Sequence, residues 1–323
     1  MRYLSPLKHR IGLFARRQIR QAALEALESS TILQAQDAKL QRLERTALEL
    51  KVVNASGGGA RPAYYLGNNR SLTITARGDR MFVDTRDIAI TPGILCFGGW
   101  EDDTTAILDR FFKPGMVWAD VGANCGYFTV IGHKLVKAGG QAGETYAFEI
   151  SPDNFRLCVD NLVLSWTQEG SHVEQMAIYS SVGSVTFHVF TKYGVNSSTS
   201  NISDEFAAYI GEKPKVVTVP STTLDAYFLK RPRLPQFVKI DIEGNELHAL
   251  QGGRGLIEAV PDIKLLIEWS PGQMVSCGNE PRALAELIPQ LGLKCFNAEN
   301  DMAPLTVSDC LAIERTNMFL LSR

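Results

Sequence analysis

Residues 117–127, VWADVGANCGY, decide the fold of this chain. A short apolar run ends at Asp120. A turn that contains Gly122 and Gly126 follows, and a helical run continues to about Val136. Glycine tolerates positive φ and a close backbone approach, and the first N–H groups of a helix point into the turn before it. The pattern is therefore typical of a strand–loop–helix nucleotide site.

The second carboxylate of this unit is Glu149, near the end of the apolar stretch TYAFEI. A carboxylate at the tip of the second strand is placed to accept hydrogen bonds from the hydroxyls of a ribose. The loop spacing, D-x-G-x-x-x-G, lacks the middle glycine that lets a dinucleotide pyrophosphate lie against the backbone in G-x-G-x-x-G. We therefore expect a nucleoside ligand without phosphates. Two simpler interpretations stay open, namely that the glycines only form a turn and that Glu149 caps the next helix.

From about residue 87 to its C-terminus the chain resembles the FkbM-type S-adenosylmethionine-dependent methyltransferases. The motifs that carry the resemblance stand in the family's order: GGWE at 98–101, DVGANCGY at 120–127, FEISPDNF at 148–155, STTLDAY at 221–227, VKIDIEGNELHALQGG at 238–253 and LLIEWSP at 265–271. The departures are few. Cys125 stands where the family more often has an aliphatic residue, His133 where it has a small one, and SPDN replaces a P-x-P form. None of these departures affects the carboxylates.

The resemblance implies an α/β, Rossmann-like class I methyltransferase fold, with a seven-stranded, mostly parallel sheet and helices on both faces. It also implies S-adenosyl-L-methionine as the cofactor, and O-methylation of a hydroxyl on a sugar, glycan or secondary metabolite. Two alternatives stay open: an NAD- or nucleotide-sugar-binding Rossmann oxidoreductase, and a noncatalytic helical scaffold with a vestigial methyltransferase domain. The missing middle glycine opposes the first, and the retained acidic residues oppose the second.

We expect the cofactor to contact the ends of three strands, through Asp120, Gly122, Ala123, Asn124, Gly126, Tyr127, Glu149, Ile150 and Asp241. Asp120 is predicted to lie near the methionine end and to order the loop, while Glu149 holds the ribose. Asn124 is predicted to add an amide contact to the amino-acid part of the cofactor.

Further apolar runs predict strands at 172–178, 237–242, 263–269, 294–296 and 317–321. Helical segments separate most of these runs, and this alternation is typical of α/β folds. Ligands of open parallel sheets bind outside the carboxyl ends of the strands. The residues at these ends are therefore the candidates for chemistry.

Asp241 and Glu268 are the predicted catalytic residues, because both stand at or near such strand ends. A hydroxyl acceptor needs a carboxylate or a histidine within hydrogen-bond reach to take its proton. Glu243 follows on a chain expected to be extended, so it should face the same side as Asp241, although a helix-cap role stays open. His248 is a weaker candidate, since its L-H-A-L context is more typical of a half-exposed helix. We predict no metal, because the sequence contains no His/Cys cluster at metal spacing.

The composition agrees with one enzyme domain and an appendage. The 323 residues are 45% hydrophobic, enough for a full core, and the net charge of -2 gives no general attraction to nucleic acid, which is not an expected partner. The six cysteines are scattered without a C-x-x-C pair, which argues for reduced thiols and a cytoplasmic protein. No window approaches the roughly 20 apolar residues of a transmembrane span.

Residues 1–53 are predicted to form a basic N-terminus and a long helix, followed by a glycine-rich linker at 54–62. Three roles stay open for the helix at 18–51: packing on the catalytic domain, homo-oligomerisation through a short coiled coil, and peripheral contact of the basic end with the inner face of a membrane. Beyond the linker we expect a small β/α extension at 63–112 and the Rossmann-like methyltransferase domain at 113–323.

Overall fold

The computed structural model of the protein describes residues 61–190 and 212–323. The predicted N-terminal helix, with the roles considered for it, and nearly all of the predicted linker lie outside these residues. The described residues comprise the predicted β/α extension and most of the predicted Rossmann-like domain.

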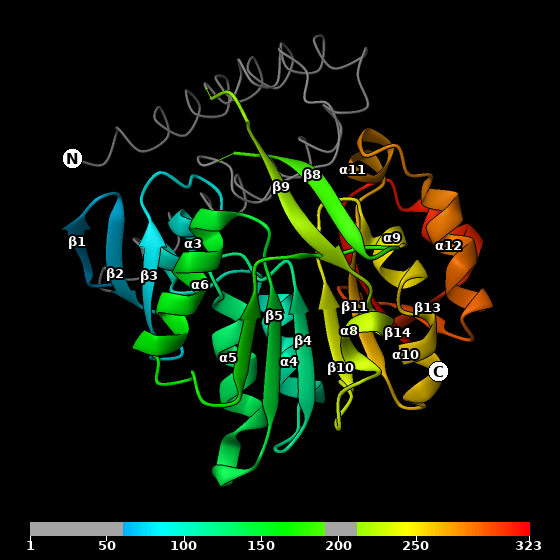
Figure 1. Ribbon diagram of the computed structural model, residues 1–323, viewed down its shortest axis with the longest axis horizontal. Helices are drawn as coiled ribbons and strands as arrows, with labels where there is room; N and C mark the ends of the chain where they lie inside the picture. Colours follow the sequence, from blue (N-terminus) through cyan, green and yellow to red (C-terminus); the bar gives the residue numbers. More distant parts are fainter. Residues whose placement is uncertain (1–60, 191–211) are drawn as a thin grey trace, which may run out of the picture.

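An eight-stranded mixed sheet forms the centre of the described part, in the order β13-β12-β14-β11-β10-β4-β5-β6 (Figure 1). The strands are β4 (Val117–Val121), β5 (Glu144–Phe148), β6 (Ser171–Glu174), β10 (Phe237–Ile240), β11 (Lys264–Trp269), β12 (Lys294–Asn297), β13 (Ala303–Leu305) and β14 (Asn317–Ser322). The strands from β11 to β6 run parallel to one another, whereas β14 is antiparallel to both of its neighbours. The predicted Rossmann-like fold is confirmed. The sheet has one strand more than the seven predicted, because the short β13 pairs with β12 at the edge.

The central strands read as continuous apolar runs because both faces of the sheet are covered. Every residue of β4 and of β10 is buried. Side chains alternate between the two faces, so Trp118, Phe237 and Leu266 belong to one hydrophobic core while Val238 and Leu265 belong to the other. This alternation also decides which charged side chains share a face at the site.

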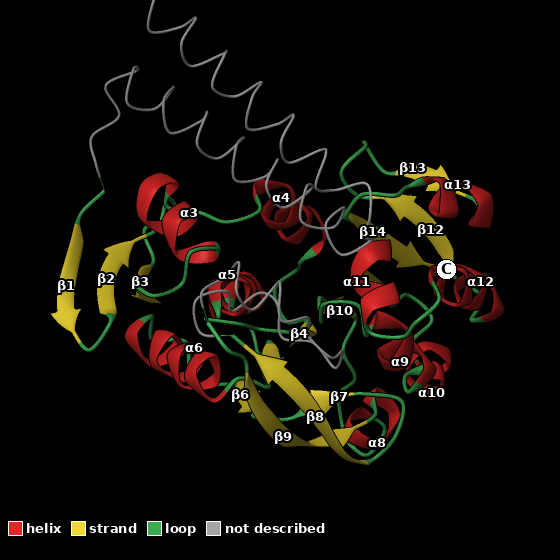
Figure 2. Cartoon of the chain, turned by 90° about the horizontal axis from the view of Figure 1, so that it is seen from above, coloured by secondary structure: helices red, strands yellow, loops and turns green. Residues whose placement is uncertain are grey.

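Helices cover both faces, as the view from above shows (Figure 2). One layer contains α3 (Ile90–Phe97), α4 (Asp102–Phe111), α5 (Tyr127–Val136) and α6 (Pro152–Leu164), and the other contains α8 (Leu224–Phe228), α9 (Glu246–Gln251), α10 (Arg254–Ala259) and α12 (Pro281–Gln290). The shorter helices are η1 (Ala138–Gly140), α11 (Pro271–Ser276) and α13 (Val307–Ala312). Helix α5 has the bounds predicted for it. It starts directly after Gly126, the last residue of the loop, which has a left-handed backbone with a φ of 83°.

Two smaller sheets accompany the central one. The first contains β1 (Ala63–Gly67), β2 (Arg70–Ile74) and β3 (Arg80–Asp84), and the second contains β7 (Ala177–Ile178), β8 (Gly183–Val189) and β9 (Lys215–Thr222). The prediction of one strand over 172–178 is wrong. The chain divides there into β6, at the edge of the central sheet, and β7, which leaves that sheet to pair with β9.

All six cysteines lie within the described residues and are free thiols. Over the same described ranges, the helices are too short or too polar to cross a membrane.

Candidate active site

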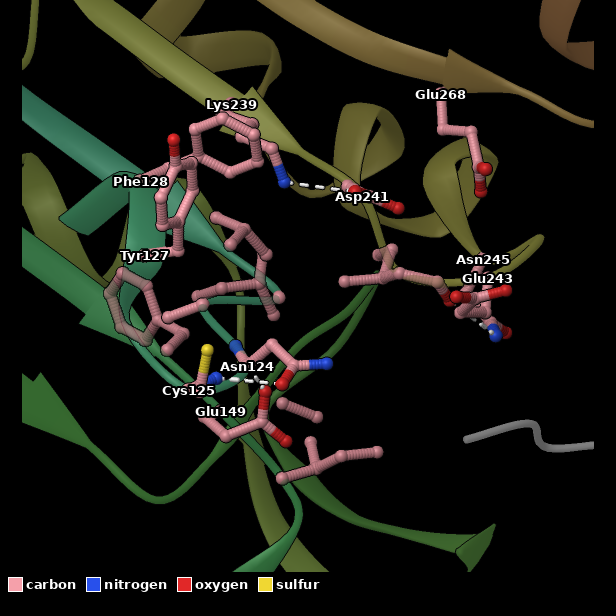
Figure 3. A pocket seen from close by; sticks show the side chains of 18 of the residues that line it. Asn124, Cys125, Tyr127, Phe128, Glu149, Lys239, Asp241, Glu243, Asn245 and Glu268 are labelled. Atoms are coloured by element: carbon pink, nitrogen blue, oxygen red, sulfur yellow. Dashed lines mark hydrogen bonds and ion pairs between the residues drawn. The ribbon is translucent and has the colours of Figure 1, made fainter. Parts of the chain in front are cut away.

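A cavity opens at the carboxyl ends of β4, β5, β10 and β11 (Figure 3). It encloses about 1000 Å³ of empty space, part of it open to solvent. The strand order reverses here, because the chain passes from β4 to β5 on one side and β10 lies on the other side of β4. Ligands of open α/β sheets bind at such a point, so this cavity is the candidate ligand site.

Most of the predicted cofactor residues line this cavity: Gly122, Ala123, Asn124, Tyr127, Glu149, Ile150 and Asp241. The predicted catalytic residue Glu268 lines it as well, whereas Asp120 and Gly126 do not. The structure therefore brings the carboxylates of three strand ends, Glu149, Asp241 and Glu268, to one space.

The loop after β4 owes its shape to packing within the protein. Gly122 has a φ of 86°, and a Cβ atom there would lie 1.9 Å from the carbonyl oxygen of Asp241. Gly126 has a φ of 83°, and its Cβ would lie 2.8 Å from Cys158 Sγ. Within the protein, these glycines allow a close approach to Asp241, just after β10, and to α6. Their predicted close approach to a ligand stays a prediction. Both glycines thus hold the loop between its neighbours.

Glu149 ties this loop to the end of β5. Its Oε2 accepts a hydrogen bond of 2.8 Å from the backbone N–H of Asn124, and its Oε1 accepts one of 2.7 Å from that of Ser151. A carboxylate has about four acceptor positions, so it can still receive hydroxyl groups. Glu149 as a whole is only 6% exposed, and burial raises the pKa of its carboxyl group to about 7.

Asp120 lies beneath the cavity. It is fully buried, and the hydroxyl of Thr129 on α5 donates a 2.6 Å hydrogen bond to its Oδ2. Burial raises the pKa of Asp120, and the ammonium group of Lys239, 4.0 Å from Oδ1, opposes that rise. The predicted role in ordering the loop stays a prediction, but the side chain is not placed to touch a ligand in the cavity.

Lys239 is a cavity residue that the sequence interpretation missed. It is 1% exposed in β10, and its Nζ donates a 2.9 Å hydrogen bond to Asp241 Oδ2 (Figure 3). Burial by itself lowers the pKa of a lysine, but Asp241 and Asp120 together hold the pKa of Lys239 above its ordinary value. The only signal in the sequence is a lysine inside the otherwise apolar run FVKI.

Asp241, Glu243 and Glu268 form a carboxylate cluster in which one oxygen of each lies within 4.8 Å of the others. Asp241 and Glu268 meet because their strands are paired in register up to Ile240 and Ile267. The expected extended chain at Glu243 is wrong: β10 ends at Ile240, and Glu243 has a φ of 58°. Glu243 reaches the cluster through this turn, where Gln273 Nε2 donates a hydrogen bond to it.

The carboxylate cluster has the oxygen ligands that a divalent cation such as Mg²⁺ prefers. We nevertheless expect enzymatic turnover to continue in EDTA, because Lys239 already contacts Asp241 and Gln273 already contacts Glu243. The measurement is the rate of turnover before and after chelation. Loss of activity in EDTA, restored by Mg²⁺, would show that the cluster is a metal site.

His248 does not line the cavity. Its ring stacks on Tyr179 with 4.2 Å between the ring centres, and Tyr179 is the member of this pair that faces the cavity. His248 is half-buried, as its sequence context indicated.

Two further cavity residues, Trp100 and Glu101, come from the turn between α3 and α4. The GGWE motif of the extension thus contributes to the same site as the strand ends.

The mixed sheet and the cavity at the carboxyl ends of its parallel strands are those of a Rossmann-like α/β fold. The family described as Methyltransferase FkbM domain matches residues 120–292. Because the match covers more than half of the chain, the protein belongs to the FkbM methyltransferase family, as the resemblance implied. Membership in this family favours methyl transfer over the oxidoreductase alternative.

Several solved structures are similar to the chain at low sequence identity. A precorrin-6y C5,15-methyltransferase from Geobacter metallireducens is 10% identical with a TM-score of 0.38, over 68% of this chain and 87% of that one. A TehB-like SAM-dependent methyltransferase from Corynebacterium glutamicum is 9% identical with a TM-score of 0.37, over 68% and 87%. An rRNA methylase from Streptococcus thermophilus is 10% identical with a TM-score of 0.36, over 68% and 93%. No curated protein matches the sequence.

Proposed function

We propose that the protein is an S-adenosylmethionine-dependent O-methyltransferase that acts on a hydroxyl group of a sugar, a glycan or another metabolite. The observation that carries the proposal is the single cavity that Glu149, Asp241 and Glu268 share. Figure 3 places Glu149 and Asn124 in one part of this cavity and Glu268 in another. One part can then hold the nucleoside, and the other can hold the acceptor.

The residues at the end of β5 fit the cofactor. Glu149 keeps acceptor capacity beyond its two backbone hydrogen bonds, as the binding of two ribose hydroxyls requires. The backbone of Asn124 is fixed by Glu149, and its side-chain Oδ1 accepts from the N–H of Cys125 at 2.7 Å. Met176, Ile178 and Phe187 give the cavity apolar walls that suit an adenine ring. Bound there, S-adenosylmethionine supplies an activated methyl group.

The chain must orient the acceptor oxygen and receive its proton. Holding reactants in line supplies roughly 7 to 11 kcal/mol of a barrier, so positioning is the main task of the protein. Asp241 and Glu268 line the cavity within the carboxylate cluster, and either one can accept a hydrogen bond and then a proton from a hydroxyl placed between them.

Two measurements test this function. Calorimetry should detect binding of S-adenosylmethionine and S-adenosylhomocysteine but not of NAD. Incubation with S-adenosylmethionine labelled in the methyl group, together with a panel of glycans and hydroxylated metabolites, should then identify an acceptor. Binding of NAD without a response to either sulfur nucleoside would rule the proposal out.

The affinity for S-adenosylhomocysteine should depend on pH through Glu149. Burial raises the pKa of this carboxyl to about 7, and ribose hydroxyls donate to its ionised form. As the pH falls below about 7, binding must first remove a proton, so the dissociation constant should rise by up to about tenfold per pH unit. Calorimetry between about pH 5.5 and 8.5 measures this dependence.

The matched control is Glu149→Gln, which should bind more weakly and with no such pH dependence. A flat profile in the unmodified protein would contradict the ribose contact. The free energy of unfolding of the unliganded protein should depend on pH in the opposite direction. Because the pKa of Glu149 is raised in the folded state, this carboxyl stabilises the fold below its ordinary pKa of 4.5. That contribution is lost as the pH rises through about 7.

A further inference from the structure

Lys239 is held in the wall of the cavity by contacts on three sides. Its Nζ lies 2.9 Å from Asp241 Oδ2, 4.0 Å from Asp120 Oδ1 and 5.1 Å from the centre of the Phe128 ring (Figure 3). Lys239 and Asp120 are register partners on adjacent strands, so the pairing of β10 with β4 sets their separation. An ammonium group fixed in this way has little freedom to move.

The polar contacts form a row that runs from the interior to the cavity. The hydroxyl of Thr129 holds Asp120, Asp120 faces Lys239, and Lys239 holds Asp241. The side chain of Asp120 is 1% exposed and that of Lys239 2%, whereas that of Asp241 is 22% exposed. Asp241 is therefore the member of the row that is most accessible from the cavity.

Stability alone does not account for this buried row. Transfer of ions out of water costs about as much as their attraction returns, and apolar replacements of such groups are often neutral or stabilising. The surroundings would accept one, because Phe237 and Phe128 belong to the hydrophobic core beside Lys239. An ammonium group does something that an apolar side chain cannot do, namely fix the direction of the Asp241 carboxylate.

We propose that Lys239 is a positioning residue for methyl transfer: held by Asp120, it fixes the Asp241 carboxylate in the orientation in which this group meets the acceptor hydroxyl. The inference rests on the proposed function, because it assigns Asp241 to the acceptor. Its physical basis is the steep cost of misplacement, since a displacement of about 1 Å can lower a rate by about 100-fold.

The test compares Asp120→Asn with the double variant Lys239→Met and Asp120→Asn. The double variant removes the buried cation together with the buried anion, so it avoids leaving either charge in the interior without the other. We expect it to fold and to bind S-adenosylhomocysteine within about threefold of the unmodified protein, while kcat and kcat/KM both fall by about 100-fold. Asp120→Asn keeps the contact between Lys239 and Asp241 and should lose only about tenfold or less.

Lys264→Met is the matched control, because Lys264 also lies over an aromatic ring, that of Phe111 at 5.8 Å, but is not a cavity residue. It should leave turnover unchanged.

A folded double variant with turnover within about threefold of the unmodified protein would overturn the inference. So would an equal loss of turnover and of S-adenosylhomocysteine affinity. Failure of the unmodified protein to transfer any methyl group would instead refute the proposed function, and the inference with it.

Discussion

Removal of the one carboxylate that takes the acceptor proton, by Asp241→Asn or by Glu268→Gln, should lower the rate of methyl transfer by roughly 100-fold or more, the usual scale for a general base. Each change keeps the shape of the side chain and removes its ability to take a proton. Both residues line the cavity, and their oxygens lie within 4.8 Å of each other in the carboxylate cluster. A hydroxyl between them is within reach of either one. The measurement is the rate of labelled methyl transfer to the acceptor that the screen identifies.

Glu258→Gln is the control for these two variants, because it makes the same chemical change on the exposed surface of α10. Binding of S-adenosylhomocysteine by each variant separates an acceptor role from a cofactor role, which matters most for Asp241. If both variants turn over at a near-normal rate, the base lies elsewhere. Glu101 is then the next residue to test, because it lines the cavity and His248 does not.

The strand ends could be predicted from the sequence because they follow from one-dimensional patterns. A buried parallel strand is a continuous apolar run, so the polar residue that closes the run marks the carboxyl edge of the sheet. Glu149, Asp241 and Glu268 close or follow such runs, and all three line the cavity. The fold class followed from the same runs and from the family motifs.

The sequence could not predict contacts that depend on strand order and on the layer above the sheet. Asp120 and Lys239 become neighbours only because β10 pairs with β4, and the thiol of Cys158 meets Gly126 only because α6 packs beside the loop. The hydroxyl of Thr129 holds the buried Asp120, a contact that depends on how α5 packs against β4. Of the four predicted carboxylates, Glu149, Asp241 and Glu268 line the cavity and Asp120 does not.

The turn at Glu243 was missed for a local reason. The sequence predicts an extended chain from Asp241 to Glu243, but Glu243 and Gly244 both have positive φ, 58° and 95°. Glu246 holds this turn, because its Oε1 accepts hydrogen bonds from the N–H groups of Ile242 and Gly244. Glycine at 244 hinted at such a turn, whereas a left-handed glutamate is uncommon enough that the sequence did not indicate it.

Gly122→Ala should destabilise the protein far more than an ordinary glycine substitution. The added Cβ would lie 1.9 Å from the carbonyl oxygen of Asp241, which is backbone and cannot rotate away, and the residue has a φ of 86°. Left-handed backbone and forced overpacking together should lower the free energy of unfolding by roughly 2 to 5 kcal/mol. Urea denaturation at an unchanged m-value measures this loss.

Gly78→Ala separates the cost of the left-handed backbone from the cost of the clash of the added Cβ. Gly78 has nearly the same φ, 82°, but nothing lies within 4 Å of its added Cβ, so only the backbone term of about 1 to 2 kcal/mol applies. The difference between the two variants is then the cost of the clash between the loop after β4 and the end of β10. Equal losses in the two variants would mean that the loop can move away from β10. In that case Gly122 would not fix the distance between the predicted nucleoside site and Asp241.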